Sequence, residues 1–227
     1  MRQRERADKV LAWFRRERPV VKTELHYDTP FQLLVAVMLS AQCTDKRINM
    51  VTPALFERYP DACTMAHATA DEIRQYIASV TYPNSKSKHL VGMAQMLCDT
   101  YDGIVPDTPR ELVKLPGVGR KTANVVLSAI YDQPRIAVDT HVYRVSRRIG
   151  LVPRTANTPL KVEEKLMRVI PEEYLADAHH WILLHGRYVC TARKPKCHDC
   201  GVSDYCKYHE QQTKKLAATP GDKRPQK

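Results

Sequence analysis

Long apolar runs and glycine are both scarce in this sequence of 227 residues. The longest strongly apolar stretch, residues 31 to 41, has about half of the ~20 residues that a transmembrane helix needs, and it contains Gln32 and Ser40. Only 8 residues are glycine, about half of the usual ~7 %, which leaves few tight turns for an all-β architecture. We therefore expect a mostly helical protein that does not span a membrane.

Acidic side chains are outnumbered, with 25 Asp and Glu against 36 Lys and Arg, so the formal net charge is +11. Such an excess is typical of proteins that bind polyanions, and nucleic acid is the leading class of partner. The amino-terminal segment MRQRERADKVLAWFRR has charges among its apolar positions and lacks the apolar core of a secretion signal. The length allows one or two domains with a real core, and we expect an intracellular protein.

The seven cysteines fall into two groups. Three are scattered through the first hundred residues, and the other four crowd into 17 positions: Cys190, Cys197, Cys200 and Cys206. An odd total with such clustering, in a chain without an export signal, favours a metal site over a disulfide framework. Cys43, Cys63 and Cys98 are expected to behave as small buried apolar residues.

Helix start signals recur along the chain and agree with the spacing of its apolar residues. Thr29-Pro30 and Thr158-Pro159 each combine an N-cap with proline at the first helical position. The segments 69–72 and 108–111 have the capping-box pattern. The sequence therefore predicts a series of short helices. Residues 210–227, with five basic and two acidic side chains and little to bury, are expected to form a disordered basic tail.

The run LPGVGRKTA, residues 115–123, predicts a helix, a tight turn and a second helix. Gly117 and Gly119, on either side of Val118, permit unusual backbone conformations and a close approach to a ligand. The first N–H groups of the second helix have no partner within the helix, and a phosphate fits there. From the spacing alone, this phosphate grip and an ordinary helix-helix corner are about equally supported.

The whole run resembles the helix-hairpin-helix motif of the DNA glycosylase superfamily, and specifically of its endonuclease III family. The resemblance extends, in the same order, to FQLLVAVMLSAQCTD, IAVDTHVYRV, HHWILLHGRYVC and the four-cysteine cluster. It implies an all-α fold of two helical domains with DNA bound at the cleft between them, and it implies that Gly117, Val118 and Gly119 of the hairpin contact the DNA backbone. The six-helix domain would span residues 23–134, with the hairpin at about 109–131. The iron-sulfur cluster domain would combine residues 1–22 and 135–209.

Lys121 follows the hairpin and lies near the start of the second helix. There, the positive end of the helix and burial would both favour a neutral amine, which is a competent nucleophile. Asp139 can return to Lys121, because eight extended residues reach about 26 Å and the helix between them rises only about 15 Å. Asp139 also fits as the N-cap of the helix that follows.

By resemblance, Lys121 is the nucleophile and Asp139 the essential carboxylate of a bifunctional DNA glycosylase and abasic-site lyase. A damaged nucleotide is extruded from the duplex, and the lysine displaces the oxidised pyrimidine from C1′. The resulting Schiff base acidifies the C2′ proton, and β-elimination cuts the strand 3′ to the lesion.

Residues on the lesion side are also assigned by this resemblance. Gln42 would fill the gap that the extruded base leaves, although a solvent-facing helix end is the simpler interpretation of its sequence context. Asp45 and His141 would line the lesion pocket, and packing is as plausible for His141. Tyr82 stands at a second wedge position. The family usually has Gly-hydrophobic-Tyr-Asn where this chain has Thr-Tyr-Pro-Asn, which puts the shape of the loop and its lesion preference in doubt.

Four cysteines can hold either structural zinc or a 4Fe-4S cluster, so the number of ligands does not decide between them. The spacing from Cys190 to Cys206 matches the cluster loop of the endonuclease III family, which implies one 4Fe-4S cluster. Arg193 and Lys194, between the first two ligands, would meet DNA phosphates.

The implied partner is double-stranded DNA with damaged pyrimidines or abasic sites, bound by a monomer that is associated with the nucleoid in the cytoplasm. Three alternatives are a thymine-mismatch glycosylase, a pyrimidine-dimer glycosylase and a noncatalytic iron-sulfur DNA-binding protein. An adenine-mismatch glycosylase typically lacks the nucleophilic lysine and has an extra carboxy-terminal domain. The presence of Lys121 and Asp139 argues against a noncatalytic protein, and Lys121 also argues against the adenine-mismatch enzyme.

Overall fold

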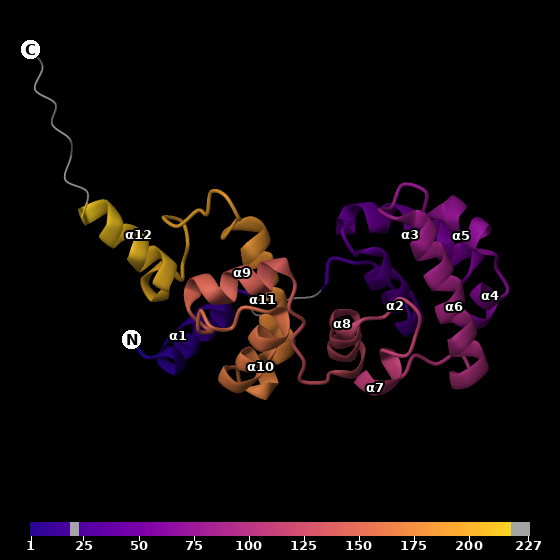
Figure 1. The fold of residues 1–227 in the computed structure, drawn as a ribbon, viewed down its shortest axis with the longest axis horizontal. Coiled ribbons are helices and arrows are strands. Elements are labelled where there is room, and N and C mark those ends of the chain that lie inside the picture. Colours follow the sequence, from indigo (N-terminus) through magenta and orange to yellow (C-terminus); the bar gives the residue numbers. More distant parts are fainter. Residues whose placement is uncertain (19–22, 219–227) are drawn as a thin grey trace, which may run out of the picture. The chain divides into compact units, whose positions relative to one another are not determined.

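The computed structural model describes residues 1–18 and 23–218, and its regular secondary structure is entirely helical within those ranges (Figure 1). The all-α prediction is therefore confirmed. No helix in the described part of the chain combines the length and apolar character needed to cross a bilayer. The chain divides into two units, one of residues 22–137 and the other of residues 1–21 and 138–227. The boundaries expected from the sequence were 22/23 and 134/135.

The unit of residues 22–137 is built around α2, a helix that is buried on nearly all sides. Thr29 caps α2 by accepting the backbone N–H of Gln32, and Pro30 occupies the first position, as the sequence predicts. The described helices of this unit are α2 (Pro30–Leu39), α3 (Asp45–Arg58), α4 (Ala62–Ala66), α5 (Ala70–Tyr76), α6 (Pro83–Tyr101), α7 (Pro109–Leu112) and α8 (Arg120–Tyr131). The described part of this unit thus has seven helical segments where six helices were expected, and α4 and α7 are each about one turn long.

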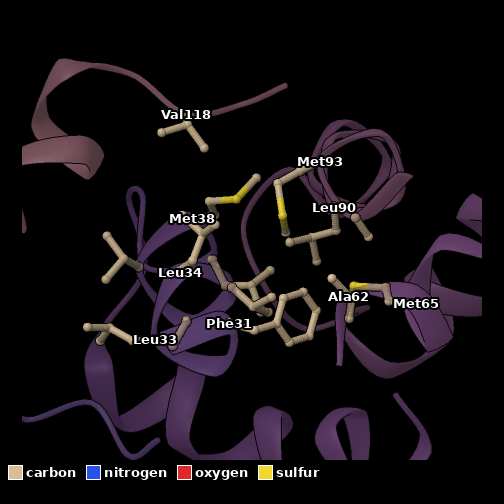
Figure 2. Close-up of a cluster of buried hydrophobic side chains, with 14 of the residues drawn as sticks. Phe31, Leu33, Leu34, Met38, Ala62, Met65, Leu90, Met93 and Val118 are labelled. Atoms are coloured by element: carbon tan, nitrogen blue, oxygen red, sulfur yellow. The ribbon is translucent and has the colours of Figure 1, made fainter. Parts of the chain in front are cut away.

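Side chains from distant parts of this unit meet at α2. Figure 2 shows Phe31, Leu34 and Met38 of α2 among Leu90 and Met93 of α6. Burial of this kind stabilises the folded chain by about 1.5–3 kcal/mol for each large apolar side chain. The core of this unit is therefore centred on α2.

The other described unit contains the amino terminus and the four-cysteine segment. Its elements are α1 (Gln3–Glu17), α9 (Thr140–Ile149), α10 (Pro159–Val169), the 3-10 turn η1 (Glu172–Tyr174), α11 (Leu175–Tyr188), the 3-10 turn η2 (Ser203–Tyr205) and α12 (Lys207–Ala218). Phe14 of α1 stacks on Trp181 of α11 with ring centroids 6.1 Å apart. This contact packs the amino-terminal helix against a helix from the last quarter of the sequence.

Two expectations are corrected by the structure. Residues 210–218 belong to α12 rather than to a disordered tail, and residues 219–227 lie outside the described residues. The helix begins beside the packed Tyr208 and continues through good helix formers, with an ion pair between Glu210 and Lys214. Cys63 of α4 and Cys98 of α6 form a disulfide instead of remaining separate thiols. Packing of α4 on α6 brings these two cysteines together across a sequence separation of 35.

Candidate functional site

The hairpin between α7 and α8 is held by its apolar residues. Leu115 and Val118 are buried, and the N–H of Val118 donates to the carbonyl of Leu115 at 3.0 Å. Figure 2 shows the Val118 side chain on the side of Met38. The Val118 side chain is in the core and its N–H donates within the hairpin, and the contact of Val118 with DNA stays a prediction. Its role in the structure is to anchor the hairpin.

The two glycines of the hairpin do different things. Gly117 has φ +77°, and a Cβ there would lie 2.8 Å from Cβ of His89 and 2.9 Å from Cε of Met38. Gly119 has φ −95°, which any residue adopts, and a Cβ there would have no neighbour within 4 Å in the described structure. The first glycine is required by the turn itself, whereas the second leaves open space in front of α8.

Lys121 lies in the first turn of α8 and is exposed. The burial that the sequence suggested for Lys121 is therefore not found in the structure. Gly119 is the N-cap of α8 and supplies no side-chain acceptor for the first turn. Backbone N–H groups at such a helix start bind anions well.

Asp139 is the N-cap of α9. Its Oδ1 accepts the backbone N–H of Val142 at 2.7 Å, and its side chain is half-buried. The capping role that the sequence allowed is therefore present. Lys121 belongs to the unit of residues 22–137 and Asp139 to the other unit.

Gln42 and Tyr82 are both exposed, and both have φ +56°, in the left-handed region that residues other than glycine rarely adopt. Tyr82 is 61 % exposed, which is unusual for a large aromatic side chain. The loops that carry them are joined, because the hydroxyl of Thr81 donates to the carbonyl of Gln42 at 2.7 Å. Two strained residues are thus presented to solvent from loops that contact each other.

Lys86 supports the first of these loops and was missed by the sequence analysis. Its buried ammonium donates to the carbonyls of Leu39 and Ala41 at 2.7 and 2.6 Å, just before Gln42. Burial lowers the pKa of Lys86 below its ordinary value. Lys86 precedes Leu90 by four residues, so both lie on the apolar stripe of α6. A lysine on an apolar stripe is the sequence signal that could have indicated a buried, hydrogen-bonded ammonium.

The other two lesion-side residues, Asp45 and His141, each lie in the first turn of a helix. Asp45 is the first residue of α3 and is half-buried, following the N-cap Thr44. His141 is in the first turn of α9, and its Nδ1 lies 3.1 Å from a guanidinium nitrogen of Arg144. A Cβ added to Gly186 of α11 would come 2.9 Å from Cβ of His141, so this histidine packs tightly between two helices.

The four clustered cysteines surround one small pocket between α11 and α12. All four are free thiols, and the apolar side chains of Ile149, Val189 and Val202 also line the pocket. Among the described residues, no group of three His, Cys, Asp or Glu side chains is placed to hold a single metal ion. Tetrahedral zinc would need sulfurs converging at about 2.3 Å from one point. A 4Fe-4S cluster binds each thiolate through a different iron, so thiols spread around a pocket fit it better.

The surroundings of the thiols are apolar, but N–H groups are directed at them. Burial, with help from the neighbouring cysteines, raises the pKa of the Cys200 thiol to about 11. Burial also raises the pKa of the Cys206 thiol. The backbone N–H groups of Tyr208 and His209, at the start of α12, donate to its Sγ and partly oppose that increase. Arg148 donates to the Sγ of Cys190 at 3.6 Å. Such donors are well suited to thiolates that carry negative charge on a bound cluster.

The loop between the first two cysteines is fixed by hydrogen bonds. Arg148 of α9 donates to the carbonyls of Thr191 and Ala192 at 2.7 and 2.8 Å. The hydroxyl of Thr191 donates to the carbonyl of Lys194 at 2.7 Å. Arg193 and Lys194 are both exposed on this loop. Their charges are therefore presented to solvent from an ordered backbone.

Comparison with known proteins agrees with these features. Residues 35–172 match the model of the HhH-GPD superfamily base excision DNA repair proteins, and residues 190–206 match the iron-sulfur binding domain of endonuclease III. The chain is 47 % identical over 202 residues to endonuclease III of Rickettsia felis, which covers 89 % of this chain and 94 % of the relative. The chain belongs to the endonuclease III family. It is therefore a base excision repair enzyme with DNA glycosylase and abasic-site lyase activities, and it holds a 4Fe-4S cluster.

Solved structures extend the comparison for this endonuclease III family member. A trapped covalent intermediate of an endonuclease III with DNA has a TM-score of 0.88 at 40 % identity, covering 94 % of this chain and all of that one. A thermostable thymine-DNA glycosylase has a TM-score of 0.80 at 22 % identity, covering 92 % of this chain and 97 % of that one. The second likeness concerns the fold alone, so it adds no support for a thymine-mismatch activity.

Proposed function

We propose that this enzyme removes oxidised pyrimidines from double-stranded DNA with Lys121 as the nucleophile and Asp139 as the essential carboxylate. The observation that carries the proposal is the exposed Lys121 amine in the first turn of α8, directly after the anchored hairpin. The open space at Gly119 allows a DNA phosphate to approach the N–H groups of that turn. A damaged nucleotide held by this grip and extruded from the duplex exposes C1′ to the amine.

The chemistry takes place in two stages. The neutral Nζ of Lys121 attacks C1′, the bond from C1′ to the base breaks, and the base leaves with a proton. Asp139 stabilises the positive charge that develops on the sugar and assists the proton transfers. Ring opening gives a protonated imine between Nζ and C1′. Loss of a C2′ proton then expels the phosphate from C3′, which cuts the strand on the 3′ side.

The lesion-side and cluster assignments belong to the same proposal. Gln42 and Tyr82 enter the gap in the duplex, and their exposure and joined loops support this role. Asp45 and His141 each contact the extruded lesion. The cluster is held by the thiolates of Cys190, Cys197, Cys200 and Cys206, and it fixes the loop that directs Arg193 and Lys194 toward phosphates.

The enzyme acts as a monomer in the cytoplasm and stays with the nucleoid through DNA binding. The domain assignment made from the sequence, with an iron-sulfur domain distinct from a helix-hairpin-helix domain, is retained apart from the tail.

Borohydride trapping on a duplex with thymine glycol tests the nucleophile. The wild-type enzyme and a Lys114→Ala control, which removes another exposed lysine beside the hairpin, should form a covalent adduct. Lys121→Ala should form none. An adduct that survives Lys121→Ala, or no adduct from the wild-type enzyme on thymine glycol or abasic DNA, would overturn the assignment. Iron and acid-labile sulfide analysis of the four single Cys→Ala variants tests the cluster ligands. Each variant should contain less iron and sulfide than the wild-type enzyme, and an unchanged content would remove that cysteine from the ligand set.

A further inference from the structure

A second cationic site lies in the unit that contains the cysteines. A cavity of about 550 Å³ separates the last turns of α9 from the start of α12, a size common among ligand pockets. Five of its lining side chains are cationic, and none of its described lining residues is acidic. The cationic residues are Arg144, Arg147, Arg148, Arg154 and Lys207. We call this cavity the α9–α12 pocket.

Two of the guanidinium groups in the pocket are held in place by ring contacts and hydrogen bonds. Arg147 lies over the Tyr143 ring, 4.9 Å from its centroid, and donates to the Tyr143 hydroxyl at 2.6 Å. Arg148 lies 4.8 Å from the ring centroid of Tyr208, and it donates to two backbone carbonyls and, at 3.6 Å, to the Sγ of Cys190. The hydroxyl that accepts from Arg147 is neutral. The Nε of Arg147 is buried with no hydrogen-bond partner in the described structure.

Lys207 reaches the pocket because of a glycine. Gly150 ends α9 with φ +91°, and a Cβ there would lie 2.7 Å from Cδ of Lys207. The absence of that Cβ lets the lysine stem lie against the end of α9, where Lys207 lines the pocket. The negative end of α9 attracts these cations, and Arg147 and Arg148 already occupy its last turn.

We propose that the α9–α12 pocket binds phosphate groups. Like charges that line one pocket repel one another, and an anion bound among five cations removes much of that repulsion. Arginine is suited to phosphate because its planar donors bind two oxygens at once. The phosphate can come from a free nucleotide or from the backbone of DNA. The proposal does not depend on Lys121 or Asp139.

The test uses the cluster-loaded enzyme and a double variant, Arg154→Gln with Lys207→Gln, which removes two exposed cations of the pocket. The control is Lys161→Gln with Arg168→Gln, which removes the same charge from exposed positions of α10. Unchanged visible absorbance of the cluster and an unchanged melting temperature show that each variant is folded. ADP is titrated into each protein by calorimetry, and binding of undamaged duplex DNA is measured between 50 and 200 mM salt.

A free-nucleotide site predicts that ADP binds the wild-type and control proteins equally and binds the pocket variant at least tenfold more weakly. A DNA site predicts that the slope of log K against log salt falls by about 1 to 2 more in the pocket variant than in the control. Either result supports a phosphate site and identifies its source. Equal behaviour of the two variants in both measurements overturns the proposal, as does the absence of ADP binding together with equal DNA slopes.

Discussion

The hydroxyl of Thr81 donates a hydrogen bond to the backbone carbonyl of Gln42 at 2.7 Å, across 39 positions of sequence. It connects the two exposed loops that carry the residues with φ +56°, Gln42 and Tyr82. The resemblance to the family predicts glycine at this position, and Thr81 supplies a hydroxyl that glycine lacks. The Thr-Tyr-Pro-Asn segment therefore forms a loop that is tied to its neighbour.

Thr81→Val removes this hydroxyl while keeping the shape of the side chain. If Gln42 and Tyr82 enter the duplex together, loss of about 1 kcal/mol of loop ordering should slow single-turnover base release about fivefold. Thr81→Ser keeps the hydroxyl and should retain most of the rate. Equal rates for the Val and Ser variants would show that the hydrogen bond does not contribute.

Lys86→Met should make the loop that leads to Gln42 more mobile. The carbonyls of Leu39 and Ala41 would lose their ammonium donor, at a cost of about 2 kcal/mol in unfolding free energy. Lys88→Met changes an exposed lysine of the same helix and should leave stability unchanged. Urea unfolding measures the cost. Amide hydrogen exchange should accelerate at residues 39–44 in the Lys86 variant only, and uniform protection there would contradict the assigned contact.

Sequence patterns gave the helix starts because capping is a local interaction. Thr69 and Glu72 form the complete capping box that was predicted. Thr108 caps its helix as expected, but the carboxylate of Glu111 binds Lys114 and Tyr101 instead of closing the box. That difference depends on packing between helices, which the spacing of residues does not specify.

The same reason explains what the sequence did not reveal at the candidate site. The role of Lys86 depends on the position of α6 beside the end of α2, and the bond from Thr81 to Gln42 depends on two loops meeting. The hairpin was recognisable because its residues are consecutive. Even there, only the structure shows that Gly117 has a positive φ and that Gly119 does not.

Asp139→Asn separates the two roles of this residue. Asparagine is as good an N-cap as aspartate, so the unfolding free energy should change by less than about 0.5 kcal/mol. The negative charge is lost, and base release should slow by about 100-fold or more. Denaturant unfolding and single-turnover incision measure the two effects. Full activity in the Asn variant would show that Asp139 acts only as the N-cap of α9 and that its charge is not needed for catalysis.

The two hairpin glycines should respond differently to alanine. Gly117→Ala places a Cβ against His89 and Met38 at positive φ, and it should cost about 2 kcal/mol of stability or more. Gly119→Ala should change stability by less than about 0.5 kcal/mol, because its backbone is ordinary and its surroundings are open. If a phosphate approaches there, DNA affinity should nevertheless fall in the Gly119 variant. Unchanged affinity would place the phosphate elsewhere.

The disulfide between Cys63 and Cys98 should make stability depend on reductant. Closing a loop of this length stabilises a protein by about 3–4 kcal/mol in the chain-entropy model. Reductant, or Cys63→Ala with Cys98→Ala, should therefore lower the unfolding free energy by an amount approaching that figure, whereas Cys43→Ala should leave the dependence intact. The measurement is denaturant unfolding under anaerobic conditions, so that the cluster is preserved. Identical unfolding with and without reductant, together with two alkylatable thiols in the native protein, would return Cys63 and Cys98 to the buried apolar role predicted from the sequence.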